Sequence, residues 1–329
     1  MENKIEREYS LSQHRTFTNK GWRDMRVKNK KVGFIGLGVM GKSLANHLLK
    51  KCDSVFVYNR TKEKANELVE AGAKWCHSPQ EIAEKAELIF TMIGTPKDVE
   101  SVYLGEKGLI HHGQRGTILV DMTTSTPTLA KKLYKLGLER GIHVIDAPVS
   151  GGDIGAKNAN LTIMGGGDEE IFKRIRPYLL IFGQNIIYHG SAGAGQHTKM
   201  CNQIAVASNM MGITEAIVYA RKAGLNPQKV LESISAGAAG SWSLSNLVPR
   251  ILANDFAPGF MIEHFVKDMK IAIDEAESMG LDLPGLAQAK KLYDVMMKKG
   301  EGRSGTQALI KYWDDELKTN EHKKTVSLS

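Results

Sequence analysis

A glycine-rich hexapeptide near the start of the chain has the residue types and spacing of a phosphate-binding turn. The segment Gly36-Leu37-Gly38-Val39-Met40-Gly41 follows an apolar run, Val32–Gly36, and precedes a helix-like stretch, Lys42–Lys50. Its first glycine permits a tight turn, the second lets backbone approach a pyrophosphate, and the third allows close helix–strand packing. The N-terminus of the following helix then offers N–H groups to the anion. We predict a dinucleotide site; a purely structural glycine turn is the alternative.

The end of the second apolar run bears on which dinucleotide binds. An NAD-preferring fold usually has an acidic residue here to hold the ribose 2′-hydroxyl, and this sequence has Asn59-Arg60-Thr61 instead. Arg60 can pair with a 2′-phosphate, with Asn59 and Thr61 as neutral donors. Alternatively, Arg60 is a surface charge where a helix over Thr61–Glu70 begins. We predict NADP as the preferred cofactor, with NAD as the second option.

A short segment after the fifth predicted strand has groups suited to binding a carboxylate. It runs from Asp146 to Gly152 and contains Ser150-Gly151-Gly152. In open α/β sheets, ligands lie beyond the carboxyl ends of the strands. Ser150 would present a hydroxyl there, and the glycines would present bare backbone N–H groups.

The segment Gly193–Gln203 contains the strongest candidate for proton chemistry. Lys199, Asn202 and Gln203 lie at positions i, i+3 and i+4, on one face of a helix. A lysine whose pKa burial lowers to roughly 7–8 can donate a proton in carbonyl reduction and accept one in alcohol oxidation. A surface lysine on a connecting helix is the alternative. A third segment, Phe260–Asp268, lies further along the chain.

Alternating strand-like and helix-like segments must position these residues. This alternation indicates βαβ units and a doubly wound parallel sheet. Two helices have start signals, since Ser78-Pro79 precedes Glu81 and Thr126-Pro127 repeats the cap-and-proline arrangement. The expected strands are Val32–Gly36, Ser54–Tyr58, Leu88–Ile93, Thr117–Asp121, His143–Asp146 and Leu161–Met164.

The alternation ends near residue 193. Residues 196–223 read as one long helix, and further helices follow, with breaks expected near Pro227, Pro249, Pro258 and Pro284. We therefore predict an α/β fold in which a Rossmann doubly wound sheet precedes an all-α C-terminal domain. The expected division is a flexible arm over residues 1–30, an NAD(P)-binding domain over 31–193 and a helical substrate or dimerisation domain over 194–329.

Composition and charge limit the class of protein. Of 329 residues, 42% are hydrophobic and 24% are charged, as in ordinary globular proteins. With neither a long apolar span nor a secretory signal, we expect a cytoplasmic protein with no membrane contact. Much of the net charge of +8 lies in residues 1–31. We interpret this arm as a solvated tail and expect no nucleic-acid partner; a basic arm for nucleic acid or an acidic surface is the alternative.

Cysteines and histidines form no disulfide or metal-ligand pattern. The histidine pair His111-His112 has no ligand spacing, and we interpret it as surface. The three cysteines contain no CxxC pair, which excludes a disulfide framework and a structural zinc site and fits a reducing compartment. They are Cys52, Cys76 and Cys201. We predict no metal.

The order and spacing of the motifs resemble the β-hydroxyacid dehydrogenase family, which includes 3-hydroxyisobutyrate dehydrogenases and glyoxylate/succinic semialdehyde reductases. The resemblance covers about residues 31–315 and rests on Gly33–Gly41, Asp146–Gly152, the Lys199 segment and Lys267-Asp268. It implies hydride transfer between NADP(H) or NAD(H) and a small carboxylate-bearing alcohol or aldehyde. It also implies a homodimer or homotetramer.

The resemblance assigns roles to individual residues of this sequence. Lys199 would be the catalytic lysine. The substrate would contact Ser150, Gly151, Gly152, Asn202, Gln203, Phe260 and Asp268. The cofactor would contact Gly36, Leu37, Gly38, Val39, Met40, Gly41, Asn59, Arg60, Thr61, Met92, Thr124 and Lys267, with Thr124 at the nicotinamide.

One position departs from the family pattern. Many members carry two asparagines after the lysine, and this chain has Asn202-Gln203, so we do not assume 3-hydroxyisobutyrate itself as the substrate. An NADPH-linked reductase of small aldehydes is our main interpretation. An NAD-linked 3-hydroxyisobutyrate dehydrogenase is the second, and a non-catalytic nucleotide-binding scaffold protein is the third.

Overall fold

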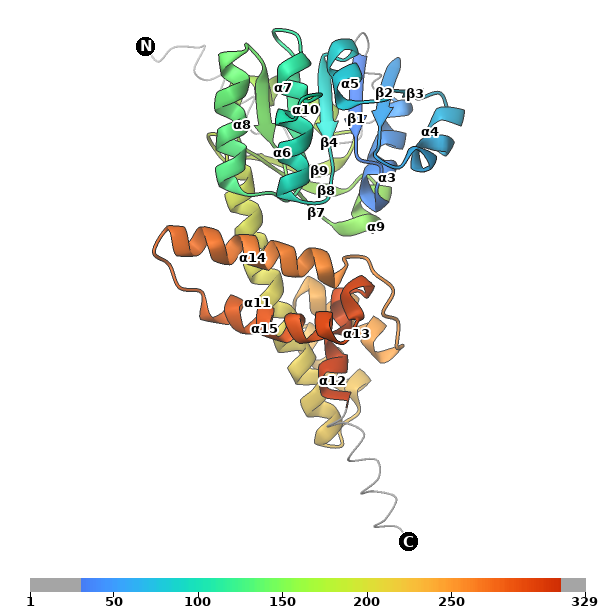
Figure 1. Cartoon of the computed structure of the whole chain (residues 1–329). Helices are drawn as coiled ribbons and strands as arrows, with labels where there is room; N and C mark the ends of the chain where they lie inside the picture. The colour runs from blue at the N-terminus through green and yellow to red at the C-terminus, as the bar shows by residue number, and fades with distance from the viewer. Residues whose placement is uncertain (1–30, 315–329) are drawn as a thin grey trace, which may run out of the picture.

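The computed structural model describes residues 31–314, and its central feature is a six-stranded parallel sheet (Figure 1). The predicted arm over residues 1–30 lies outside the described part. The strands are Lys31–Ile35 (β1), Ser54–Tyr58 (β2), Lys74–Trp75 (β3), Leu88–Thr91 (β4), Ile118–Asp121 (β5) and His143–Asp146 (β6). Their order, β3-β2-β1-β4-β5-β6, reverses between β1 and β4. This reversal creates the crevice at the carboxyl ends where such sheets bind ligands.

Helices cover both faces of the sheet, as its nearly continuous apolar strands require. Phe34 and Ile35, neighbours in β1, belong to hydrophobic cores on opposite faces. The predicted caps of α5 (Pro79–Lys85) and α8 (Pro127–Glu139) are confirmed, because Ser78 Oγ accepts from Glu81 N and Thr126 Oγ1 accepts from Leu129 N. The elements around the sheet are Val39–Leu49 (α3), Lys62–Ala65 (η1), Asn66–Glu70 (α4), Pro79–Lys85 (α5), Pro96–Leu104 (α6), Leu109–His112 (α7), Pro127–Glu139 (α8) and Glu169–Leu179 (α10).

One expected strand belongs to a different sheet. The segment predicted over Leu161–Met164 forms β8 (Leu161–Gly165) of a separate three-stranded sheet, between β7 (Val149–Ser150) and β9 (Gly183–Tyr188). It pairs antiparallel with β7 and parallel with β9. We missed β3, β7 and β9, because two have only two residues and the polar start of β9 hides its pattern.

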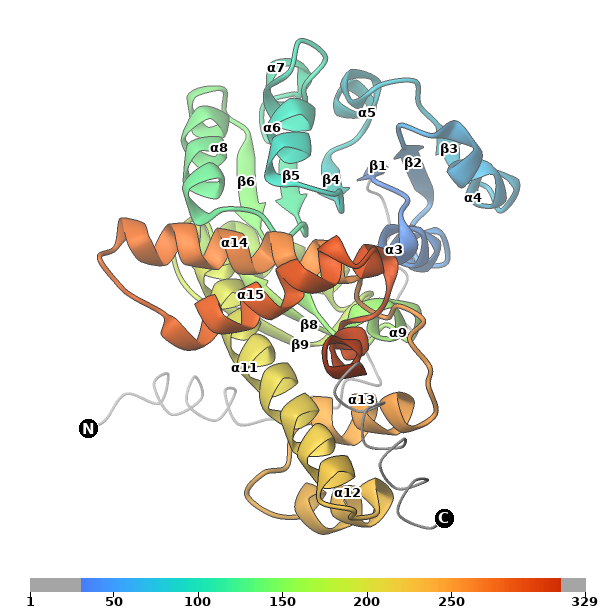
Figure 2. The ribbon, with the colours of Figure 1, turned by 60° about the horizontal axis from the view of Figure 1, so that its bottom comes forward.

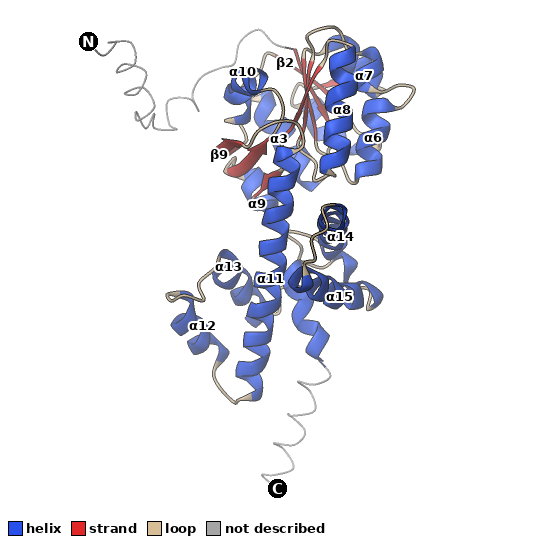
Figure 3. Ribbon diagram, turned by 90° about the vertical axis from the view of Figure 1, so that its left-hand side faces the viewer, coloured by secondary structure: helices blue, strands red, loops and turns tan. Residues whose placement is uncertain are grey.

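A long helix, α11 (Ala194–Lys222), leaves the sheet and forms the axis of an all-helical part (Figure 3). It confirms the helix expected over 196–223. The helices α12 (Pro227–Ser235) and α13 (Trp242–Leu252) lie on one side of it, and α14 (Ile262–Ser278) and α15 (Pro284–Lys298) lie on the other. The break expected at Pro249 is wrong, since this proline lies inside α13. The elements are Pro227–Ser235 (α12), Trp242–Leu252 (α13), Ile262–Ser278 (α14), Pro284–Lys298 (α15), Glu301–Arg303 (η2) and Thr306–Trp313 (η3).

The first turn of α11 is fastened to the sheet by a buried carboxylate. Asp146, the last residue of β6, accepts hydrogen bonds from Gly193 N at 2.8 Å and from Gln196 N at 2.9 Å. Backbone from β8 is so close that a Cβ at Gly195 would lie 2.4 Å from Met164 O. Glycine is therefore required where the helix leaves the sheet.

Within residues 31–314, no helix combines the length and the apolar character needed to cross a bilayer. The same residues contain no group of three or more His, Cys, Asp or Glu side chains placed to hold a metal ion. All three cysteines are free, as their spacing predicts.

Two glycine-to-alanine substitutions on α11 should have opposite effects. Gly195→Ala should lower the free energy of unfolding by about 1–3 kcal/mol, because its new methyl group meets backbone that cannot move freely. Gly212→Ala, where a Cβ would meet nothing within 4 Å, should raise the helix stability by about 0.5–1 kcal/mol. Urea unfolding followed by circular dichroism measures both, and equal changes would contradict the close approach.

Candidate active site

The three glycines of the predicted phosphate loop differ in their surroundings. Gly36 has φ +97°, and a Cβ there would lie 2.2 Å from Met92 O. A Cβ on Gly41 would lie 1.9 Å from Gly36 O, so helix and strand could not pack as closely. A Cβ on Gly38 would meet nothing within 4 Å. The space above Gly38 is thus open, as the approach of a pyrophosphate requires.

The loop is held from the side by Asn59. Its Oδ1 accepts from Leu37 N at 2.9 Å, and its Nδ2 donates to Thr61 O at 2.8 Å. Asn59 therefore shapes the glycine loop, a role that sequence reasoning missed. The N-terminus of α3 has no side-chain cap and no acidic residue in its first turn, and Val39 there is exposed. Backbone N–H groups at such an end are suited to an anion.

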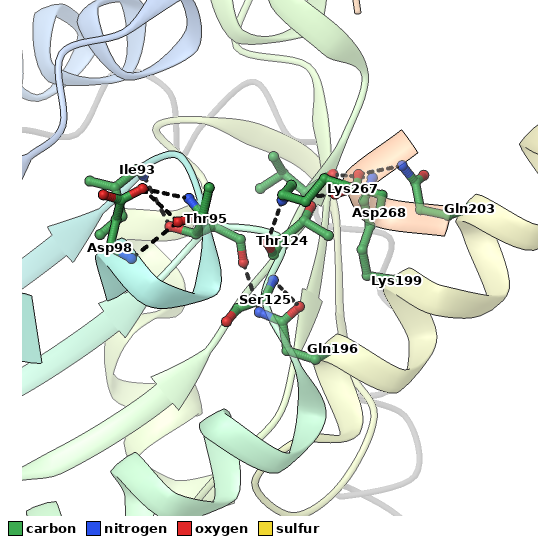
Figure 4. Close-up of polar contacts among 12 residues, drawn as sticks. Ile93, Thr95, Asp98, Thr124, Ser125, Gln196, Lys199, Gln203, Lys267 and Asp268 are labelled. Atoms are coloured by element: carbon green, nitrogen blue, oxygen red, sulfur yellow. Dashed lines mark hydrogen bonds and ion pairs between the residues drawn. The ribbon is translucent and has the colours of Figure 1, made fainter. Parts of the chain in front are cut away.

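Arg60 extends into solvent next to this loop. Its side chain is 90% exposed, and its Nη1 lies 3.6 Å from Asp98 Oδ1. Asp98 Oδ2 is already engaged, since it accepts from both the N–H and the hydroxyl of Thr95 (Figure 4). Thr61 is also exposed. The Arg60 guanidinium thus forms a long, exposed ion pair with Asp98, and an anion that binds it more tightly would replace this contact.

Lys199 is buried in the first turns of α11 although it has a charged head. It is 7% exposed, and its Nζ donates to Val149 O at 2.8 Å. The pKa of its ammonium is lowered to about 8. Burial is the main cause of this shift, the Asp268 carboxylate opposes it, and the Lys267 charge adds to it. The pKa thus lies close to neutral pH, as proton transfer in both directions requires.

A chain of polar side chains joins α11 and α14 beside Lys199 (Figure 4). Asn202 Nδ2 donates to Gln203 Oε1 at 2.8 Å, and Gln203 Nε2 donates to the buried Asp268 Oδ2 at 2.6 Å. Asp268 Oδ1 forms an ion pair with Lys267 Nζ at 2.9 Å. The Gln203 side chain, which is longer than that of an asparagine, therefore reaches Asp268.

The helix α14 passes below the carboxyl ends of the large sheet (Figure 2). This position lets Lys267 Nζ donate to Thr124 O at 2.9 Å, across the junction between the two parts of the chain. Thr124 and Met92 are half-buried in the loops after β5 and β4. Lys267 thus links the loop proposed for the nicotinamide to the chain of polar groups beside Lys199.

The predicted carboxylate-binding segment lies next to Lys199. Ser150 is half-buried at the end of β7 and follows Val149, whose carbonyl Lys199 contacts. Gly151 and Gly152 have φ values of +133° and +64° and lead into α9 (Gly152–Lys157). A Cβ on Gly152 would lie 3.5 Å from Gly259 O. The structure thus brings this segment, Lys199 and the loop before Phe260 to one place.

Phe260 and the histidine pair His111-His112 have different surroundings in the structure. The ring of Phe260 packs against Phe265, with centroids 5.4 Å apart, and is half-buried. His111 and His112 lie in α7, where each ring Nε2 contacts a backbone carbonyl, of Leu104 and Glu106 respectively. The pair is therefore structural.

A buried polar network behind the site was missed from the sequence. Asp121 Oδ1 accepts from Thr91 Oγ1 at 2.9 Å and from Thr123 N at 3.1 Å. The pKa of Asp121 is raised to about 6. Burial is the main cause, the hydrogen bonds from Thr123 and Thr91 oppose it, and the neighbouring Asp146 carboxylate adds a smaller increase. Gln196, fully buried, bonds to the same loop. Strand ends and a helix start supply these groups, so no local spacing marks them.

Models of two protein families match adjoining parts of the chain. The NAD binding domain of 6-phosphogluconate dehydrogenase matches residues 31–190. A model described as the NAD-binding part of NADP-dependent 3-hydroxyisobutyrate dehydrogenase matches residues 193–313. An uncharacterized oxidoreductase of Bacillus subtilis, YkwC, is 54% identical over 284 residues, which are 86% of this chain and 99% of that protein. The chain belongs to the 3-hydroxyisobutyrate dehydrogenase, or β-hydroxyacid dehydrogenase, family.

Two further relatives extend this result. A protein of Arabidopsis thaliana named as a probable mitochondrial 3-hydroxyisobutyrate dehydrogenase-like protein is 48% identical and covers 86% of this chain and 84% of its own length. The solved structure of Mycobacterium tuberculosis 3-hydroxyisobutyrate dehydrogenase with L-serine has a TM-score of 0.79 at 30% identity, covering 85% of this chain and 98% of that one. The protein is an NAD(P)-dependent oxidoreductase that acts on CH–OH groups, which confirms the predicted fold and enzyme class.

The buried Asp121 should make stability depend on pH in an unusual direction. Its folded pKa of about 6 lies above the value of about 3.9 in an unfolded chain. The folded state therefore holds this proton more tightly, and the group's contribution to stability falls as pH rises from 4 to 6. Asp121→Asn should gain stability relative to wild type over that range, by up to about 3 kcal/mol. Urea unfolding at pH 4.5 and 7.5 tests this; a difference independent of pH would contradict it.

Proposed function

We propose that the protein transfers hydride between NADP(H) and a small alcohol or aldehyde that carries a carboxylate, with Lys199 as the catalytic acid and base. The observation that carries this proposal is a buried lysine with a pKa near 8, whose Nζ donates to Val149 O, next to Ser150 in the chain. A non-catalytic scaffold protein has no need to bury such a group beside a complete glycine loop.

The residues at the crevice suit a dinucleotide. Gly38 leaves open space above the backbone, and the start of α3 is neither capped by a side chain nor flanked by acids. Arg60 follows Asn59, which holds the glycine loop, and within residues 31–314 its ion-pair partner is Asp98, at the long distance of 3.6 Å. The match to a model of an NADP-dependent dehydrogenase agrees with this preference. NAD remains the alternative if Arg60 serves only as a surface charge.

Bound NADPH supplies a hydride from C4 of its nicotinamide to the carbonyl carbon. Lys199 as an ammonium stabilises the charge that develops on the carbonyl oxygen and then donates a proton to it. In oxidation, neutral Lys199 removes the hydroxyl proton. Its bond to Val149 O fixes Nζ beside Ser150, whose hydroxyl and following N–H groups orient the substrate carboxylate. Phe260 limits access of water to this end of the site.

The substrate end also supports a small hydroxyacid. The L-serine named with the solved Mycobacterium tuberculosis enzyme carries both a carboxylate and a hydroxymethyl group, the two groups that Ser150 and Lys199 would address here. Gln203 occupies space beside Lys199 through its bond to Asp268, and with Asn202 it sets the shape of that end. We expect the substrate to be a short acid for this reason.

We also propose that the chain forms a homodimer or homotetramer through its helical part. Large apolar side chains are exposed on it, and burying them against a second copy removes them from water. They include Tyr219, Leu225, Trp242, Met279 and Leu281. The helical domain from residue 194 onward would then serve both substrate binding and assembly.

Removing the Lys199 amine should abolish proton transfer without harming cofactor binding. Lys199→Ala should lower kcat at least roughly a hundredfold, and Lys199→Arg should rescue little, because arginine cannot release its proton near neutral pH. In wild type, kcat for reduction should fall as pH rises through about 8, and kcat for oxidation should rise there. Stopped-flow kinetics and NADPH fluorescence titration measure these. A variant that keeps more than about a tenth of wild-type kcat would exclude this role for Lys199.

Removing the Arg60 guanidinium should affect one cofactor only. A charge-assisted contact to phosphate contributes about 1.5–3 kcal/mol, so Arg60→Ala should weaken NADPH roughly tenfold to a hundredfold. NADH, which lacks the 2′-phosphate, serves as the internal control and should bind as before. Isothermal titration with both cofactors decides the point, and an equal loss for both would show that Arg60 does not contact the 2′-phosphate.

A further inference from the structure

Gln196 has an unusual environment for an uncharged polar side chain. It lies in the first turn of α11, and none of its surface is exposed. Its Nε2 donates to Thr123 O at 2.7 Å, and its Oε1 accepts from Ser125 N at 3.0 Å. Its own N–H is held by the Asp146 carboxylate. One amide thus bonds to the peptide groups on both sides of Thr124.

The loop around Thr124 is consequently fixed from two helices. Gln196 on α11 holds the backbone before and after this residue, and Lys267 on α14 donates to the Thr124 carbonyl at 2.9 Å. Figure 4 shows these contacts converging on the loop between β5 and α8. The Thr123 hydroxyl is also used, since it accepts from Ile93 N at 3.0 Å. The loop can hardly shift unless the first turn of α11 shifts too.

Lys199 follows Gln196 by three residues, on the same side of α11. The distance between the Lys199 amine and the Thr124 loop is therefore set within one helical turn. We infer that Gln196 is a positioning residue that fixes the Thr124 loop, which is proposed to contact the nicotinamide, relative to Lys199. The hydride then reaches the carbonyl carbon while the proton from Lys199 reaches the oxygen of the same group. This inference rests on the roles proposed above for Thr124 and Lys199.

Gln196→Met tests the inference, because methionine has similar length and lacks both hydrogen bonds. We expect kcat to fall roughly tenfold to a hundredfold, the loss expected for misplacement by about an ångström. KM and Kd for NADPH should stay within about threefold, since Gln196 lies away from the phosphate loop. The primary isotope effect on kcat with C4-deuterated NADPH should increase, because hydride transfer becomes more rate-limiting.

Thr198→Val is the matched control on the same turn. Thr198 is half-buried, and its hydroxyl donates to Ala194 O within α11. This variant should keep kcat and the isotope effect of the wild type. Melting temperatures of both variants show that the assays use folded enzyme.

Gln196→Glu provides a rescue that depends on pH. A carboxylate still accepts from Ser125 N, but only the protonated acid can donate to Thr123 O. The ratio of its kcat to that of wild type should therefore rise as pH falls from 8 to 6. The titratable groups that contact this turn and loop, Asp146, Asp121 and Lys267, are present in both enzymes. The same ratio for Gln196→Met should stay flat.

The outcomes separate this inference from the proposed function. If wild type reduces carboxylate-bearing aldehydes with NADPH and Gln196→Met behaves like Thr198→Val, the positioning role is overturned. It is also overturned if Gln196→Met loses activity with an unchanged isotope effect, because hydride transfer is then no more rate-limiting than in wild type. Failure of the proposed function has another signature: Lys199→Ala would match wild type, whatever the Gln196 variants do.

Discussion

The Asp146 carboxylate determines where α11 begins, and much of the site depends on that point. It accepts from two N–H groups of the helix start while its own backbone pairs with Gly166. Burial raises the pKa of Asp146, and the N–H donors oppose that shift. The helix N-terminus favours a negative charge at this position. Small residues are needed around the contact, because a Cβ at Gly195 or Gly166 would meet Asp146 within 3 Å.

The helix α11 begins at this contact with Asp146, and it holds both a side chain that binds the sheet part and the lysine proposed for catalysis. Its buried first turn holds Gln196, which bonds to the loop after β5, and the next turn holds Lys199 and Gln203, which bond to Val149 O and to Asp268. Lys199 is desolvated between the sheet and α14, and this desolvation lowers its pKa. The burial that fixes the lysine in space therefore also tunes its proton affinity, so the position of α11 sets both.

The cofactor end follows a different principle, because it relies on backbone and open space. Gly36 and Gly41 allow close contacts that other residues could not make, while Gly38 leaves room above the loop. Two side chains flank this loop. Asn59 accepts a hydrogen bond from Leu37 N and so shapes the turn, and the Arg60 side chain is exposed to solvent. An exposed charge such as that of Arg60 contributes little to the fold.

Features that depend on neighbouring residues can be predicted from the sequence alone. The glycine loop, the strand–helix alternation, the capped helices and the shared face of Lys199 and Gln203 all follow from local backbone geometry and period. The contacts between distant segments became known from the folded structure. It put Leu161–Gly165 into a second sheet, kept α13 intact through Pro249, buried Lys199, and joined Gln196 and Lys267 to the Thr124 loop. The physical reason is that burial and long-range hydrogen bonds arise between segments distant in the chain, and no local pattern encodes their distance.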